Sequence, residues 1–158
     1  VKDRRLNGLF SFVKTSSEAE SKSKPISKSR VEYELGAYQK ARIDIIKDML
    51  ALEKTLIDND ENLQTNKFSD MLKSWLKGKG EANKVRFQND VDLLVAVRNA
   101  FSHNQYPMYN SEVFKGMKLL SLSSDIPEKE GLGIAKQLKD KIKETIERII
   151  EIEKEIRN

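Results

Sequence analysis

A single histidine, His103, follows Arg98 by five residues in the string RNAFSH, at the end of an apolar segment. An imidazole has an ordinary pKa of about 6.5, so it can accept or donate a proton near neutral pH. A guanidinium is permanently charged and binds phosphate oxygens in bidentate fashion. RNA carries its own nucleophile, the 2′-hydroxyl, so a protein that acts on RNA need not provide one. The pair therefore favours a metal-independent ribonuclease over a deoxyribonuclease.

Arg98 lies on the apolar face of its predicted helix. At 100° per residue, with Phe87 at 0°, Arg98 falls at about 20°, next to Val91 at about 40°. Ala96 falls at about 180°, on the opposite side of the helix. A buried guanidinium without a partner would cost several kcal/mol, so we expect either a carboxylate or carbonyl partner or an open polar cleft. The first alternative makes Arg98 a structural residue, and the second makes it a site residue.

His103 would lie at about 160° on the same wheel, well away from Arg98. Both side chains can serve one site only if the helix ends or unwinds between them. The residues HNQYP, at 103–107, predict a helix end near 103–106, because proline disfavours helix in the residue before it and has no N–H to donate. A residue just past the last turn can then swing back across the helix end.

The wider pattern predicts an all-α protein. The first helix is expected over 31–57, where residues recur at spacings of three and four: Leu35, Tyr38, Arg42, Ile45, Met49, Leu52 and Leu56. Four further helices are expected between 63 and 77, over 83–104, over 111–121 and over 132–157. We therefore predict an up-and-down helical bundle of about five helices. The 4-3 spaced apolar stripe of the last helix suits core packing or, alternatively, a coiled-coil seam.

The length of 158 residues suits one domain. Residues 31–158 are expected to form the helical domain, and residues 1–30 an N-terminal arm with a flexible Ser/Lys-rich linker. The stretch GLFSFV at 8–13 fits either a strand or a docked arm. The first residue is Val1, which suggests a piece of a longer protein.

The composition narrows the class of protein. The chain has no cysteine and one histidine, so disulfides and a structural zinc site are not expected. The string DNDENL at 58–63 lacks the Gly and Glu that a calcium loop needs, and we expect neither a metal nor a cofactor. No apolar run approaches the roughly 20 residues that span a bilayer. We expect a cytoplasmic protein without membrane contact.

Basic residues gather in two zones, although the formal net charge is only +4. Residues 1–30 carry eight Lys/Arg against three Asp/Glu, and residues 67–86 carry six against two. Such zones fit a polyanion such as nucleic acid, or are ordinary solubilising charges. The candidates for RNA contact are Lys73, Lys77, Lys79, Lys84 and Arg86 for the backbone, and Tyr106 and Tyr109 for stacking on bases. The two tyrosines could instead cover the end of the bundle, and Trp75 is expected in the core.

The segment from Arg98 to His103 resembles the R-x(4–6)-H motif of HEPN ribonuclease domains, including the polar Asn99 after the arginine. The longer string RNAFSHNQYP is similar to the C-terminal HEPN domain of type VI-B CRISPR effectors, which are RNA-guided ribonucleases of antiviral defence. The resemblance covers roughly residues 31–157 and is tight over 91–109. It implies a metal-independent endoribonuclease that cleaves single-stranded RNA and leaves a 2′,3′-cyclic phosphate. By position, it implies that Arg98 contacts the scissile phosphate, His103 transfers a proton and Asn99 assists orientation.

The same resemblance implies that one copy holds half of a composite site. The second HEPN domain would lie elsewhere in the same polypeptide, whose remaining parts hold the guide RNA, or would come from a homodimer. The isolated domain is then expected to be inactive or weakly active. Two alternatives remain: a stand-alone homodimeric HEPN toxin, and a non-catalytic helical interaction module in which Arg98 is structural.

Overall fold

The computed structural model describes residues 28–65, 67–127 and 130–157. Within these ranges the chain forms five α-helices, two short 3₁₀ helices and no strand, which confirms the all-α helical bundle. The α-helices are α2 (Lys28–Asn59), α3 (Phe68–Lys77), α4 (Glu81–Ser102), α5 (Ser111–Leu119) and α6 (Lys136–Arg157), and the 3₁₀ helices are Glu61–Thr65 and Pro107–Tyr109. None of these helices is long and apolar enough to cross a membrane.

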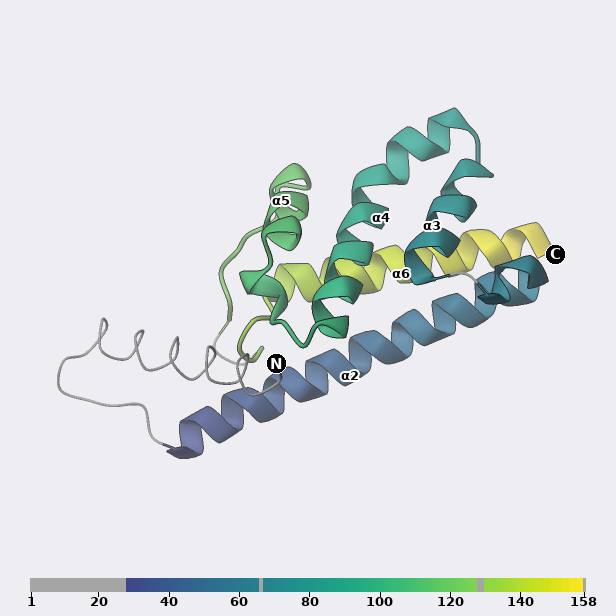
Figure 1. The fold of residues 1–158 in the computed structure, drawn as a ribbon. Coiled ribbons are helices and arrows are strands. Elements are labelled where there is room, and N and C mark those ends of the chain that lie inside the picture. Colours follow the sequence, from purple (N-terminus) through teal and green to yellow (C-terminus); the bar gives the residue numbers. More distant parts are fainter. Residues whose placement is uncertain (1–27, 66, 128–129, 158) are drawn as a thin grey trace.

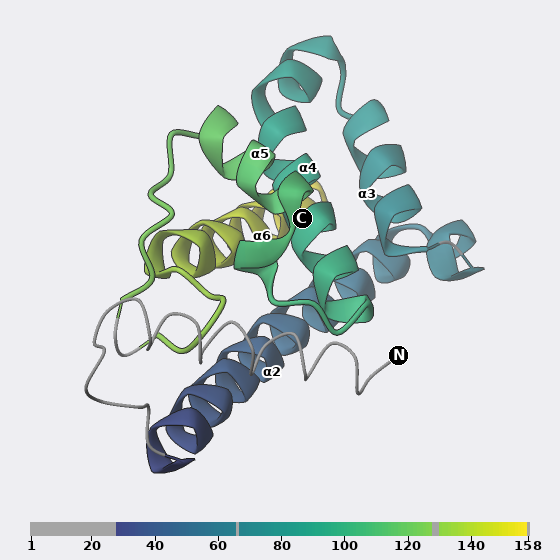
Figure 2. The ribbon, with the colours of Figure 1, turned by 60° about the vertical axis from the view of Figure 1, so that its left-hand side comes forward.

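The longest helix, α2, runs along α6, and the first turns of α2 project beyond the other helices (Figures 1 and 2). α3 and α4 form an antiparallel hairpin, and α5 packs beside α4. α4 thus contacts α3, α5 and α6. The predicted stripe of α2 faces the core, because its apolar members from Tyr38 to Leu56 are buried. The apolar stripe of α6 is also buried over Leu138–Ile149 and serves core packing.

The starts of three helices differ most from the sequence expectation. α3 begins at Phe68 rather than near 63, and a separate 3₁₀ helix covers Glu61–Thr65. The predicted linker ended at residue 30, but α2 already begins at Lys28; the rest of the linker and the stretch 8–13 lie outside the described residues. The last helix begins at Lys136 rather than 132. Gly131 and Gly133 have φ values of 84° and 87°, which belong to the left-handed region and end any helix there.

The buried face of α4 is wider than the sequence predicts. Ala96 was expected opposite the core-facing arc, but it is buried. The reason is that α5 covers part of α4: Gly116 of α5 lies so close to Leu93 that an added Cβ would be 3.1 Å from its Cδ1 atom. On the other side, Lys141 of α6 forms an ion pair with the buried Asp90 of α4, with 3.3 Å between Nζ and Oδ1. Arg98 consequently stands at one edge of a broad buried arc.

Candidate functional site

α4 ends in a Schellman motif. The Gln105 N–H donates to the Ala100 carbonyl at 2.8 Å, and the Asn104 N–H donates to the Phe101 carbonyl at 3.1 Å. Asn104 has φ 53°, the left-handed conformation that this motif requires. His103 is the C-cap, and its N–H donates to the Asn99 carbonyl at 3.1 Å. The helix end falls near its predicted position, but the helix stays regular through Ser102 and does not unwind between Arg98 and His103.

Arg98 is half-buried and its guanidinium is held within its own helix. Its Nη1 donates to the Ser102 Oγ, and that hydroxyl donates to the Arg98 carbonyl at 3.1 Å. No carboxylate among the described residues pairs with Arg98. The acidic partner that would make Arg98 a structural residue is therefore not found in the described part of the chain. The guanidinium lies at the edge between core and surface.

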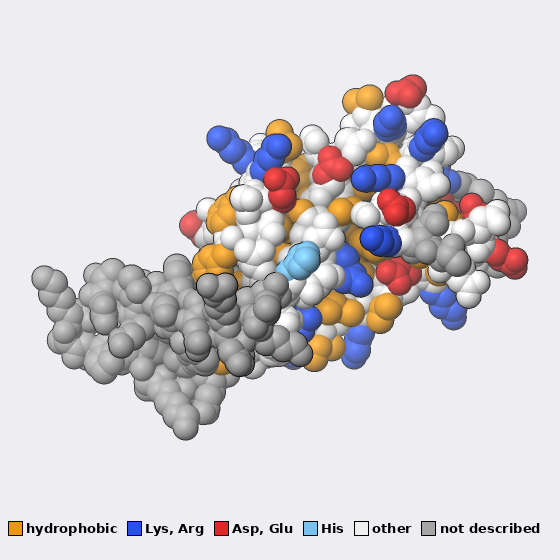
Figure 3. Space-filling model, viewed as in Figure 1, with side chains coloured by type: hydrophobic (Ala, Val, Ile, Leu, Met, Phe, Trp, Pro, Cys, Tyr) orange, Lys and Arg blue, Asp and Glu red, His pale blue; other side chains and the backbone are white. Residues whose placement is uncertain are grey.

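His103 is exposed, and Figure 3 shows the pale blue histidine on the surface with Lys or Arg side chains beside it. Five residues of regular helix turn its direction by about 140° from that of Arg98. No hydrogen bond joins the two side chains within the described ranges. Asn99 is exposed and its carbonyl receives the His103 N–H. A single chain therefore places both groups on the last turns of α4 but directs them to different sides.

Arg42 is a residue of this region that sequence reasoning did not assign to it. From α2, its Nη2 donates to the Phe101 carbonyl at 3.2 Å and approaches the Asn104 Oδ1 at 3.5 Å. The guanidinium carbon lies 5.9 Å from the Phe101 ring centroid. Arg42 thus caps the C-terminus of α4, where a cation is favourable because of the helix dipole. The available signal was an arginine within the apolar stripe of the first helix, the same anomaly that singled out Arg98.

The two tyrosines proposed for base stacking differ in exposure. Tyr106 is buried, and its ring centroid lies 4.0 Å from that of Tyr38. Gly133 packs against it so closely that a Cβ would come within 2.5 Å. Tyr109 is 36% exposed, with its ring centroid 6.2 Å from that of Tyr106. Tyr106 therefore covers the end of the bundle, and only Tyr109 presents its ring at the surface.

Burial also changes the acidity of this tyrosine cluster. Desolvation raises the pKa of Tyr38 to about 12, although the Arg42 charge opposes the rise. Desolvation, and then the neighbouring Tyr38, raise the pKa of Tyr106 well above its ordinary value. Both phenols therefore stay neutral in the folded protein at any physiological pH.

Four of the five proposed backbone-contacting residues are exposed, but one is not. Lys73, Lys77, Lys84 and Arg86 are on the surface of α3 and the first turns of α4. The Lys79 Nζ instead lies 2.8 Å from the Glu153 Oε1 and 5.6 Å from the centroid of the Trp75 ring. From Lys84 to His103 the helix rises about 28 Å, at 1.5 Å per residue. Lys84 and Arg86 therefore lie toward the opposite end of α4 from His103, and Lys73 and Lys77 lie on α3.

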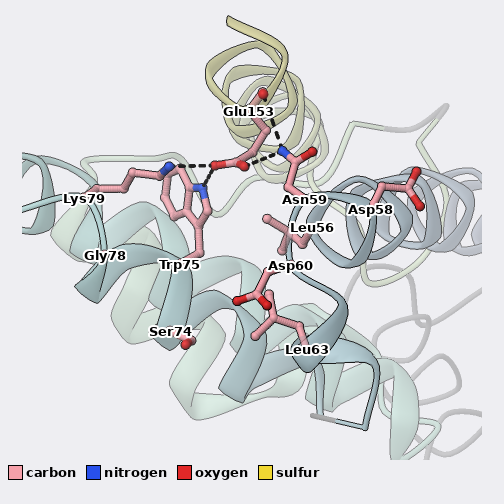
Figure 4. Close-up of a pocket in the computed structure, with 10 residues that line it drawn as sticks. All are labelled: Leu56, Asp58, Asn59, Asp60, Leu63, Ser74, Trp75, Gly78, Lys79 and Glu153. Atoms are coloured by element: carbon pink, nitrogen blue, oxygen red, sulfur yellow. Dashed lines mark hydrogen bonds and ion pairs between the residues drawn. The ribbon is translucent and has the colours of Figure 1, made fainter. Parts of the chain in front are cut away.

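A pocket of about 420 Å³ lies where α2, α3 and α6 meet (Figure 4). The Lys79, Trp75 and Asn59 side chains converge on the buried Glu153, and the Asn59 Nδ2 donates to its Oε2 at 2.6 Å. Burial alone would raise the pKa of Glu153, but the hydrogen bonds from Lys79, Asn59 and Trp75 and the Lys79 charge hold that pKa below its ordinary value. Both carboxylate oxygens accept hydrogen bonds, and the cluster joins α2, α3 and α6.

The pocket lies away from the Arg98 region, although Lys79, one of the residues predicted to contact RNA, lines it. Arg42 and Asn59 are separated by 17 residues of α2, which is about 25 Å along the helix. Groups of three or more acidic or histidine side chains that could hold a metal ion are not found among the described residues.

The fold and the α4 end define an all-α helical bundle that presents two guanidinium groups and one histidine at a helix C-terminus. Comparison of the chain with family models, with curated proteins and with solved structures finds no match in any of the three.

Proposed function

We propose that this chain is the helical domain of a metal-independent endoribonuclease that cleaves single-stranded RNA, with Arg98 and His103 as its catalytic residues and Asn99 as an orienting residue. The observation that carries the proposal is Arg98, a half-buried residue whose guanidinium has no carboxylate partner among the described residues and which stands on the last turns of α4, five residues before the exposed His103. A cation in that state is open to an anionic ligand, and a phosphodiester fits the planar, bidentate guanidinium.

The reaction requires no nucleophile from the protein. The RNA 2′-oxygen attacks the adjacent phosphorus, the bond from phosphorus to the 5′-oxygen breaks, and a 2′,3′-cyclic phosphate forms. One proton leaves the 2′-hydroxyl and another joins the departing 5′-oxygen. An imidazole serves either transfer, and a guanidinium stabilises the charge that develops on the phosphate oxygens.

The direction of the two side chains favours a site shared between two domains. Because His103 points about 140° away from Arg98 around the helix axis, one phosphate is not expected to meet both groups of the same chain. A second HEPN-like domain facing this one would bring its own histidine to Arg98 and its own arginine to His103. The second domain is proposed to lie in the same longer polypeptide, an RNA-guided effector whose remaining parts bind the guide RNA. A homodimer of this chain is the alternative source.

The test is cleavage of single-stranded RNA in excess chelator, by the chain alone and by the polypeptide from which it comes. Arg98→Ala and His103→Ala are each expected to lower the rate by roughly 10²–10⁴-fold. Lys143→Ala, at an exposed position of α6, is the matched control and should leave the rate unchanged. Cleavage only by the longer polypeptide supports the RNA-guided effector. Cleavage by the chain alone, at a rate that rises with the concentration of dimer, supports the homodimer. Full cleavage by both folded variants would refute the proposal.

One observation favours a different function, a non-catalytic helical interaction module. The Arg98 guanidinium is bonded to Ser102 within the same helix, as a purely structural arginine would be. Ser102→Ala distinguishes the two functions, because it removes this partner and leaves the charge in place. A structural Arg98 predicts a lower melting temperature for Ser102→Ala and no cleavage by any form. A phosphate-binding Arg98 predicts that cleavage persists.

A further inference from the structure

We propose that Arg42, on α2, is a second phosphate ligand of this site and binds the RNA backbone beside the phosphate contacted by Arg98. The inference rests on the proposed function and adds a residue from a distant part of the sequence to the substrate-binding surface.

Arg42 and Arg98 differ from the other half-buried Lys and Arg residues in having no carboxylate partner among the described residues. Among the residues whose burial the structure describes, six Lys or Arg side chains are half-buried: Arg42, Lys79, Arg98, Lys139, Lys141 and Arg148. Four of them have a carboxylate partner within the described residues. The pairs are Lys79–Glu153, Lys139–Glu130, Lys141–Asp90 and Arg148–Glu144. The two that have none, Arg42 and Arg98, are both at the C-terminal end of α4.

The two guanidinium groups bind adjacent residues of α4. Arg42 donates to the carbonyl of Phe101, and Arg98 donates to the hydroxyl of Ser102, the next residue. The exposed His103 follows directly. The contacts of the two arginines and the exposed imidazole therefore fall on three successive residues, 101–103, and neither arginine forms an ion pair with an acidic group of the described chain. Positive charge without a nearby anion is unfavourable, the more so for the part-buried Arg42, and an anion with two adjacent phosphates would offset it.

Arg42 also has donor capacity that the fold does not use. A guanidinium carries five N–H bonds. The Nη2 serves Phe101 and Asn104, and the Nε is shielded from solvent without a hydrogen-bond partner in the described part of the chain. The Nη1 makes no hydrogen bond to a described residue and is not among the shielded atoms. Its N–H groups are the donors that would reach a phosphate oxygen, while the Nη2 holds the guanidinium in place.

The experiment measures the salt dependence of RNA binding. All variants are made in a His103→Ala background so that the probe, a short single-stranded RNA, is not consumed. A lost phosphate contact lowers the slope of log K against log salt by about 0.7 for single strands. Arg42→Gln and Arg98→Gln are each expected to show this loss, with binding about tenfold weaker at low salt. Arg42→Lys keeps the charge and should keep the slope. Lys54→Gln, an exposed position twelve residues further along α2, is the matched control.

Each outcome decides between the roles of Arg42. A slope unchanged by Arg42→Gln but lowered by Arg98→Gln overturns the inference and leaves Arg42 as a helix cap only. A slope unchanged by both removes the proposed function as well. If Arg42→Gln does not fold, the side-chain Nε–Hε nuclear resonance of Arg42 in the His103→Ala protein gives the answer. It should shift on addition of the RNA probe, and a resonance that stays in place at saturation overturns the inference.

Discussion

Glu153→Gln tests the account of the polar cluster that joins α2, α3 and α6. The substitution keeps the shape of the side chain and removes its charge. Three donors, from Asn59, Trp75 and Lys79, then lose a charged acceptor. A hydrogen bond to a charged group contributes about 1.5–3 kcal/mol and a neutral one about 0.5–1.5, so a bond that the Gln oxygen still accepts loses about 1 kcal/mol, and a donor that faces the Gln NH₂ group loses its whole bond. We expect the free energy of unfolding to fall by about 3–5 kcal/mol, a large part of the 5–15 kcal/mol typical of a domain.

The assay is urea unfolding followed by circular dichroism at pH 7. Glu155→Gln, on an exposed position of the same helix, is the control and should change the free energy of unfolding by less than about 0.5 kcal/mol. The pKa of Glu153 is lowered by folding, so its charge stabilises the fold above the ordinary pKa of 4.5 and this contribution is lost as the pH falls through the folded value. The difference between wild type and Glu153→Gln should therefore shrink in acid. A difference below about 1 kcal/mol at pH 7 would refute the reasoning.

Two further predictions concern the tyrosine end of the bundle and its glycines. Gly133→Ala should destabilise the fold by about 3 kcal/mol in the same urea assay, because φ is 87° and the new Cβ would meet Tyr106 at 2.5 Å. Gly36 lies in α2, and no atom lies within 4 Å of the methyl group that Gly36→Ala would add, so this substitution should stabilise the fold by about 0.5–1 kcal/mol. Equal effects of the two glycine substitutions would contradict this reasoning. Because folding raises the pKa of Tyr38 from 10 to about 12, its neutral form stabilises the fold fully below pH 10 and this contribution is lost as the pH rises toward 12. Between pH 10 and 12 the free energy of unfolding should fall less steeply with pH for Tyr38→Phe than for wild type, and the two slopes should differ by up to about 1.4 kcal/mol per pH unit. Equal slopes would show that folding does not raise the pKa of this phenol.

The helices were predictable from sequence because their buried residues recur at spacings of three and four. The stripe from Tyr38 to Leu56 and the stripe from Leu138 to Ile149 are both buried. The start of α6 was not predictable, since it depends on Gly131 and Gly133 packing against tyrosines that are distant in the sequence. The burial of Ala96 has a similar cause: a helical wheel shows which residues share a face, but not that α5 covers a second face of α4.

The candidate site was predictable only in part, for a related reason. Arg98 and His103 stand out because a charge and a titratable ring end an apolar helix, and the roles assigned to them remain predictions. Arg42 could not be placed at α4 from sequence, because its contact with Phe101 spans 59 residues. The sequence does not distinguish Lys79 from the exposed lysines near it. Only its contact with Glu153 of α6, which is distant in the sequence, shows that it is paired.

The length of α2 has a consequence for how this protein can change over time. One end of the helix contributes to a network in which Lys79 is paired with Glu153, and the other end holds Arg42, which has no carboxylate partner in the described part of the chain. Since about 25 Å separates them, substitutions at the two ends are expected to combine additively. Natural variants can therefore adjust thermal tolerance near Asn59 independently of the RNA affinity that we propose for Arg42.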